Sequence, residues 1–254
     1  MKAATALLVF VASTAVALAT DIQPLIIGGS IVPAGQKTYT VGLRETAKGE
    51  NQCGGSLISS THVLTAAHCA SSKYVSIGSH FLNGSKDGER IRVKKETLHP
   101  LWNNMTVTYD YRLVELASPS KFTPIKLLAA DSEKYAGEIA TVMGWGYTSA
   151  DEVPSKELVR LNVPVLTRAQ CDAAYPGIIS ATEMCAGGKK NKDACSGDSG
   201  GPLILEQSTG DVLVGVVSWG QACGTKDKAK PGVYSRVSYV KNWIQDIAPN
   251  AVFV

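Results

Sequence analysis

The apolar residues of the chain fall into short β-branched runs that Gly, Pro, Asn and Asp residues separate. The run Val212-Leu213-Val214-Gly215-Val216-Val217 is one of them, and runs of this length and composition are typical of β-strands. A sustained helical spacing of apolar residues occurs only near the end, in residues 238–247 (Val240, Trp243, Ile244 and Ile247). We therefore predict an all-β fold with a C-terminal α-helix that Ser238 caps.

The first residues form a separate segment. Lys2 is followed by seventeen apolar and small residues, 3–19, which end in Ala17-Leu18-Ala19. This composition is typical of a signal peptide, and the run is shorter than the roughly 20 residues that span a bilayer. We expect residues 1–19 to be removed and the protein to be secreted and extracellular, with no part in a membrane.

Composition narrows the classes of function further. The 254 residues carry a formal net charge of +3, which is too small and too scattered to indicate nucleic-acid binding. Six cysteines in a secreted chain indicate disulfides, and sequence alone allows fifteen pairings. Because no two cysteines form a C-x-x-C pair, we expect no metal site. We also expect the protein to be a monomer and to use no cofactor.

A glycine-rich segment contains a candidate nucleophile. Ser199 lies in Gly197-Asp198-Ser199-Gly200-Gly201-Pro202, where the glycines let backbone N–H groups approach a reacting carbonyl. The spacing Gly197-x-Ser199-x-Gly201 also fits the nucleophile elbow of α/β-hydrolases. The two interpretations differ in where the general base must lie along the chain.

Histidine positions decide between them. An α/β-hydrolase needs its histidine after the serine, but all four histidines precede Ser199 (His62, His68, His80 and His99). The chain order acid, histidine, serine would need an acidic residue before the histidine. No acidic residue there lies in sequence surroundings that indicate catalysis. His68 in Thr65-Ala66-Ala67-His68-Cys69 has the strongest surroundings, and Asp110 opens a predicted strand. The order that fits is histidine, acid, serine, in which a carboxylate orients the base that activates the nucleophile.

Together these motifs resemble those of the chymotrypsin-like (S1 family) serine proteases, and within them trypsin, over nearly the whole chain after residue 25. Further matching segments are Ile26-Ile27-Gly28-Gly29, Ser218-Trp219-Gly220 and Pro231-Gly232-Val233-Tyr234. The resemblance implies two six-stranded antiparallel β-barrels with a C-terminal α-helix. It implies a peptidase domain at 26–254, with barrels at about 26–120 and about 136–254.

The resemblance also assigns roles to the motif residues. Ser199 would attack the scissile carbonyl, His68 would carry the proton, and Asp110 would orient His68. The backbone N–H groups of Gly197 and Ser199 would form the oxyanion hole. The six cysteines would pair as Cys53 with Cys69, Cys171 with Cys185, and Cys195 with Cys223.

A primary substrate pocket follows from the same resemblance. Asp193 lies where trypsin carries the acid at the base of this pocket, and Gly220 and Gly232 match its walls. Ser218 and Trp219 would line the cleft. Cleavage after Arg and Lys of protein or peptide substrates is implied, with protein inhibitors as further partners.

Activation is expected to need a second protease. The α-amino group of Ile26 would form a buried ion pair with Asp198 once residues 20–25, a propeptide, are removed. The protein would then be a zymogen. Leu25 precedes the cleavage point in place of Lys or Arg, so an enzyme that cuts after basic residues could not activate itself. Asn83 and Asn104 begin glycosylation sequons.

Two functions fit these residues. One is an active, secreted serine endopeptidase, which the complete set of His68, Asp110 and Ser199 favours. The alternative is a catalytically silent, protease-like binding or inhibitor protein on the same scaffold. The Leu25 junction supports the alternative, because a chain that is not cut there would stay inactive.

Overall fold

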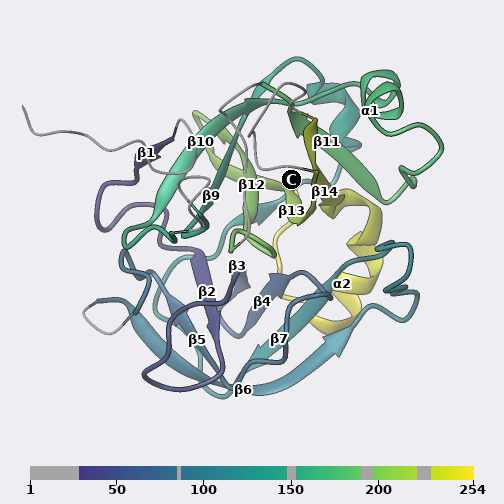
Figure 1. Cartoon of the computed structure of the whole chain (residues 1–254). Coiled ribbons are helices and arrows are strands. Elements are labelled where there is room, and N and C mark those ends of the chain that lie inside the picture. The colour runs from purple at the N-terminus through teal and green to yellow at the C-terminus, as the bar shows by residue number, and fades with distance from the viewer. Residues whose placement is uncertain (1–28, 85–86, 148–152, 190–196, 222–229) are drawn as a thin grey trace, which may run out of the picture.

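The computed structural model describes residues 29–84, 87–147, 153–189, 197–221 and 230–254. Two β-structures lie one above the other in Figure 1, with residues 40–116 forming the lower and residues 139–236 the upper. The C-terminal helix lies beside the lower structure, although it follows the upper one in the chain. The last segment of the chain therefore packs across both structures.

The first β-structure is a closed barrel of six antiparallel strands. Their order around the barrel is β2 (Thr40–Arg44), β3 (Cys53–Ser59), β4 (His62–Thr65), β7 (Arg112–Leu116), β6 (Glu89–Leu98) and β5 (Tyr74–Ile77). Apolar side chains point into its interior, where Val41, Leu57 and Val75 are fully buried. Closure of the barrel pairs backbone groups that would otherwise lie on free strand edges.

The second β-structure contains, among the described residues, six longer strands. Their order is β10 (Val159–Pro164), β9 (Ile139–Gly144), β12 (Pro202–Gln207), β13 (Gly210–Trp219), β14 (Pro231–Arg236) and β11 (Glu183–Gly187). A bridge between Val165 and Ala186 brings the two ends of this sheet together. The two-residue strands β1 (Ser30–Ile31) and β8 (Lys126–Leu127) pair with β10 and β13. The predicted two-barrel fold is confirmed, while the barrel limits near residues 120 and 136 stay a prediction.

The helices are short. The predicted C-terminal helix is present as α2 (Lys241–Ile247), but it follows a 3-10 turn, η2 (Val237–Val240), and no side chain caps either element. The prediction that Ser238 caps the helix is therefore wrong, because this residue lies inside the turn. A second helix, α1 (Arg168–Ala174), was not predicted from the sequence. Within the described residues, no helix has the length and apolar character that crossing a membrane requires.

The two barrels are joined by hydrogen bonds that pass between them. The Tyr111 hydroxyl, at the start of the segment that leads into β7, donates to the carbonyls of Thr182 and Arg236 at 3.0 and 2.8 Å. The Gly54 N–H of β3 donates to the Ser199 carbonyl at 2.7 Å. These bonds place the start of β3 against the loop that precedes β12, and the segment before β7 against the start of β11 and the end of β14.

Two of the three disulfides predicted by resemblance are present, namely Cys53–Cys69 and Cys171–Cys185. The first ties the segment after β4 to β3, and the second ties α1 to β11. The third predicted pair, Cys195 with Cys223, lies outside the described residues.

Candidate functional site

The predicted acid and base contact one another at the junction of the two barrels. The Nδ1 atom of His68 lies 2.7 Å from Oδ2 of Asp110, and the His68 backbone N–H donates to Oδ1 at 2.9 Å. Asp110 is fully buried, whereas His68 is partly exposed. The Ser218 hydroxyl of β13 donates to the same Asp110 Oδ2 at 2.6 Å. Three hydrogen bonds thus orient a buried carboxylate toward the imidazole, and one of them comes from the second barrel.

The segment that carries His68 is held by a buried arginine that sequence analysis missed. The guanidinium of Arg112, on β7, donates to the carbonyls of Ala66, Cys69 and Ala70 and to the carboxylate of Glu96. Burial lowers the pKa of Arg112, while the charges of Glu96 and Asp110 favour its protonated form. Arg112 therefore supplies charged donors to the carbonyls of the buried Ala66 and Cys69, which water could not satisfy, and to that of the exposed Ala70.

The serine loop lies against the histidine loop. Gly197 and Gly200 have φ angles of 95° and 79°, which favour glycine. A Cβ atom on Gly200 would lie 2.2 Å from Oγ1 of Thr65, so the two loops approach closely. The Ser199 carbonyl lies 3.6 Å from Sγ of Cys69. Across the described residues, however, no hydrogen bond joins the Ser199 hydroxyl to His68.

Asp198 is buried beneath the serine loop. Its Oδ1 accepts a hydrogen bond from the Gly146 N–H at 2.8 Å. Cβ atoms on Gly144 and Gly146 would lie 2.1 and 2.5 Å from its carboxylate oxygens, so only glycine leaves room for it. The predicted ion pair of Asp198 with Ile26 cannot be placed, because Ile26 lies outside the described residues.

The predicted cleft residues are only partly described. Gly220 and Gly232 face one another, with 3.8 Å between the position of a Gly220 Cβ and the Gly232 Cα. The Trp219 indole N–H donates to Glu183 at 2.7 Å, and its ring lies edge-on to Tyr175. Neither partner was predicted from the sequence. Asp193, Cys195 and Cys223 lie outside the described residues, so the charge of the predicted pocket stays a prediction.

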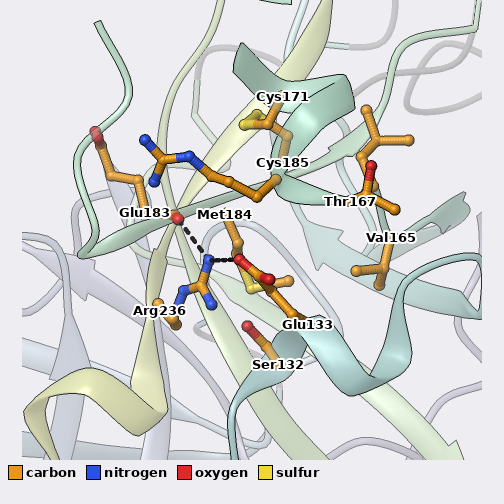
Figure 2. A pocket seen from close by; sticks show the side chains of 11 residues that line it. Ser132, Glu133, Val165, Thr167, Cys171, Glu183, Met184, Cys185 and Arg236 are labelled. Atoms are coloured by element: carbon orange, nitrogen blue, oxygen red, sulfur yellow. Dashed lines mark hydrogen bonds and ion pairs between the residues drawn. A yellow bond between two sulfur atoms is a disulfide. The ribbon is translucent and has the colours of Figure 1, made fainter. Parts of the chain in front are cut away.

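A small cavity lies away from His68 and Ser199. Figure 2 shows it beside the Cys171–Cys185 disulfide, with Arg236 bonded to the Glu183 carbonyl at 3.0 Å and 3.5 Å from a Glu133 carboxylate oxygen. Its volume of about 10 Å³ suits a single water molecule. No group of three or more His, Cys, Asp or Glu side chains in the described part of the chain is placed to hold a metal ion.

Comparisons with known proteins separate the fold from the function. A sequence model of the Trypsin family matches residues 26–244. Glucanase inhibitor protein 3 of Phytophthora infestans is 46% identical over 248 residues, which cover 93% of this chain and 94% of that protein. Glucanase inhibitor protein 2 of Phytophthora sojae is 46% identical over 237 residues, or 90% of this chain and 81% of that protein. Serine protease 1 of Rattus norvegicus is 37% identical over 253 residues, which cover 96% of this chain and 98% of that protein.

These relatives overturn the predicted activity. The prediction of a secreted endopeptidase that cleaves after Arg and Lys is wrong, because the chain is more similar to the glucanase inhibitor proteins than to serine protease 1. The physical reason is that barrels, disulfides and a His68–Asp110 contact are properties of the scaffold, and a scaffold does not determine function. The findings favour the alternative that the sequence left open. In fold and in sequence, the chain belongs to the trypsin family of chymotrypsin-like serine proteases.

Proposed function

We propose that this protein is a protease-like inhibitor that binds a glucanase and does not act by cleaving peptides. The observation that carries the proposal is its similarity to several glucanase inhibitor proteins, six of which are 43–46% identical over 89–93% of the chain. The partner is accordingly another protein, a hydrolase of glucan chains.

The geometry of the site is compatible with a role in binding alone. Asp110 connects the first barrel, through His68, with the second barrel, through Ser218. These contacts stabilise the junction of the barrels whether or not the Ser199 hydroxyl reacts. Rigid barrels with preformed loops lower the entropy cost of binding a protein partner.

Secretion is part of the proposal. Residues 1–19 have the composition of a signal peptide, and the two disulfides between cysteines of the described chain form in oxidising compartments. A secreted inhibitor would meet secreted glucanases outside the cell.

Inhibition measured on purified components tests the proposal. The mature chain is titrated into endo-glucanases that cut β-1,3 or β-1,4 linkages, and release of reducing sugar is followed. We expect inhibition of at least one enzyme that saturates near one inhibitor per enzyme, with no hydrolysis of Arg, Lys, Phe or Ala peptide reporters. A trypsin blocked covalently at its serine serves as the control of the same fold. Reporter hydrolysis without glucanase inhibition would refute the proposal.

A further inference from the structure

One loop of the first barrel exposes an apolar tip without a charged residue. Residues 98–109 comprise the last residue of β6 and most of its connection to β7, ending before Asp110. They read Leu-His-Pro-Leu-Trp-Asn-Asn-Met-Thr-Val-Thr-Tyr, with no Asp, Glu, Lys or Arg. Met105 is 90% exposed and Leu101 is 59% exposed. Exposed apolar side chains of this size cost free energy in water, so two of them on one uncharged loop make it a candidate binding surface. We call residues 98–109 the 98–109 loop.

Hydrogen bonds within the 98–109 loop hold this tip in one shape. Asn103 and Thr108 form an antiparallel bridge, and the Asn103 side-chain oxygen accepts hydrogen bonds from the backbone N–H groups of Met105 and Thr106 at 2.9 and 3.3 Å. The hydroxyls of Thr106 and Thr108 lie 2.9 Å apart. A tip that is ordered before it meets a partner loses little entropy on binding.

The backbone of the same loop is strained. Val107 and Tyr109 have φ angles of 55° and 54°, a left-handed conformation that β-branched and aromatic residues rarely adopt. Such strain persists only where surrounding contacts impose it, and it is found preferentially at functional sites. In the sequence, both strained residues lie between the exposed Met105 and the buried Asp110.

Aromatic packing fixes the base of the 98–109 loop to the C-terminal segment. The His99 ring stacks on Tyr109 with 4.8 Å between centroids and meets Trp243 of α2 edge-on at 4.9 Å. Tyr109 contacts Tyr239, which is 48% exposed and extends the surface onto η2. The connection between β6 and β7 lies beside α2 in Figure 1.

A groove continues the surface beyond Tyr239. It has a volume of about 370 Å³, and Ser238 and Tyr239 are among the residues that line it. Its arginines are paired with acids, since Arg236 lies 2.5 Å from Asp131 and Arg168 lies 2.9 Å from Asp172. The groove therefore adds little net charge to an uncharged loop.

The chemistry of the 98–109 loop fits one kind of partner surface. A glucan is an uncharged polymer of hydroxyl groups, and glycoside hydrolases flank its scissile bond with two carboxyl groups. Asn and Thr side chains can donate hydrogen bonds to such carboxylates, while acidic residues would repel them. A protruding tip with amides, hydroxyls and an apolar side chain matches a concave, glucan-binding cleft.

We propose that the 98–109 loop inserts Met105 into the glucan-binding cleft of the inhibited enzyme, with Tyr239 contacting the rim. This inference rests on the proposed function and names the inhibitor's contact surface. Inhibition is then competitive with glucan. A glycan at the sequon Asn104-Met105-Thr106 would cover the same tip, so the proposal includes that Asn104 is unmodified in the inhibiting protein.

The test compares wild type with Met105→Glu and Ile139→Glu, all made in a bacterial periplasm, where Asn104 stays unglycosylated. Ile139 is 57% exposed at the start of β9 and is the matched control. When the wild-type inhibitor is added to an endo-glucanase that it inhibits, we expect the KM of that enzyme for soluble glucan to rise while its kcat stays unchanged. Met105→Glu should weaken inhibition about tenfold or more, while Ile139→Glu inhibits like wild type. Equal thermal unfolding of the three proteins excludes misfolding.

Each other outcome has a distinct meaning. Inhibition by wild type that Met105→Glu retains, or inhibition that lowers kcat alone, overturns the insertion while the proposed function stands. Equal loss in Met105→Glu and Ile139→Glu also overturns it, because the contact would not be specific to the loop. Failure of wild type to inhibit either the β-1,3 or the β-1,4 endo-glucanase overturns the proposed function and the insertion together.

Discussion

Both oxygens of the Asp110 carboxylate contact His68, one through the backbone N–H at 2.9 Å and one through the ring Nδ1 at 2.7 Å. Since Ser218 donates to the same carboxylate from the second barrel, Asp110 is a structural link as well as a partner of the imidazole. This double role would let such a site persist in a protein that binds a partner without cleaving it.

Removal of the Asp110 carboxylate should destabilise the fold. Asp110→Ala leaves the His68 N–H and the Ser218 hydroxyl without their buried acceptor, which we expect to lower the free energy of unfolding by about 3 kcal/mol. Denaturant unfolding measures this loss. Asp246→Ala, at an exposed position on α2, is the control and should change stability by less than about 0.5 kcal/mol. Equal stability of Asp110→Ala and wild type would show that the link is unimportant.

The glycines around Asp198 should not tolerate a side chain. In Gly144→Ala the new Cβ would lie 2.1 Å from Oδ1 of Asp198, and we expect a loss of about 2 to 3 kcal/mol in unfolding free energy. Gly220→Ala is the matched control, since among the described residues its Cβ would meet only the Gly232 Cα, at 3.8 Å. If the two variants were equally stable, the carboxylate would have to occupy another position.

Acid should weaken the 98–109 loop through His99. Burial lowers the pKa of His99 from its ordinary value of 6.5, and its Nδ1 accepts a hydrogen bond from the Leu101 N–H at 3.2 Å. Below about pH 6.5 the unfolded chain binds a proton that the folded chain resists, so stability falls as the pH is lowered toward about 5. Burial also lowers the pKa of His62, which contributes in the same direction.

The variant His99→Phe separates the two histidines. It keeps the aromatic packing and removes the titrating group, so unfolding measured between about pH 7 and pH 5 should depend less on pH than in wild type. Its stability at neutral pH should be lower, because the Leu101 N–H loses an acceptor. An unchanged pH dependence would exclude His99 as a source of the effect.

The Cys53–Cys69 disulfide closes a loop with a sequence separation of 16. Replacement of both cysteines by Ser should lower the free energy of unfolding by about 3 kcal/mol, because the unfolded chain gains conformational entropy. Thermal unfolding of the double variant measures the loss, and the corresponding Cys171 and Cys185 double variant, with a separation of 14, should lose a similar amount. An unchanged melting temperature in either variant would contradict this estimate.

Local motifs made the fold and the pairing of His68 with Asp110 predictable. The role of Arg112 was not predicted, because arginines are mostly exposed and only the structure shows that this one bonds the carbonyls of the His68 loop. Helix α1 was missed because seven residues give too little periodicity, although Thr167 and Gln170 form a capping box that the sequence contains. The sequence favoured the endopeptidase over its inhibitor alternative, and that preference was wrong, because inhibitor and enzyme can share one set of core residues.

The most direct test of an inhibitor that acts by binding compares wild type with Ser199→Ala in glucanase inhibition. We predict equal inhibition by the two proteins and an intact glucanase band on a denaturing gel after prolonged incubation with either. Loss of inhibition in Ser199→Ala, together with glucanase fragments produced only by wild type, would show that the protein acts by proteolysis and would contradict the proposal.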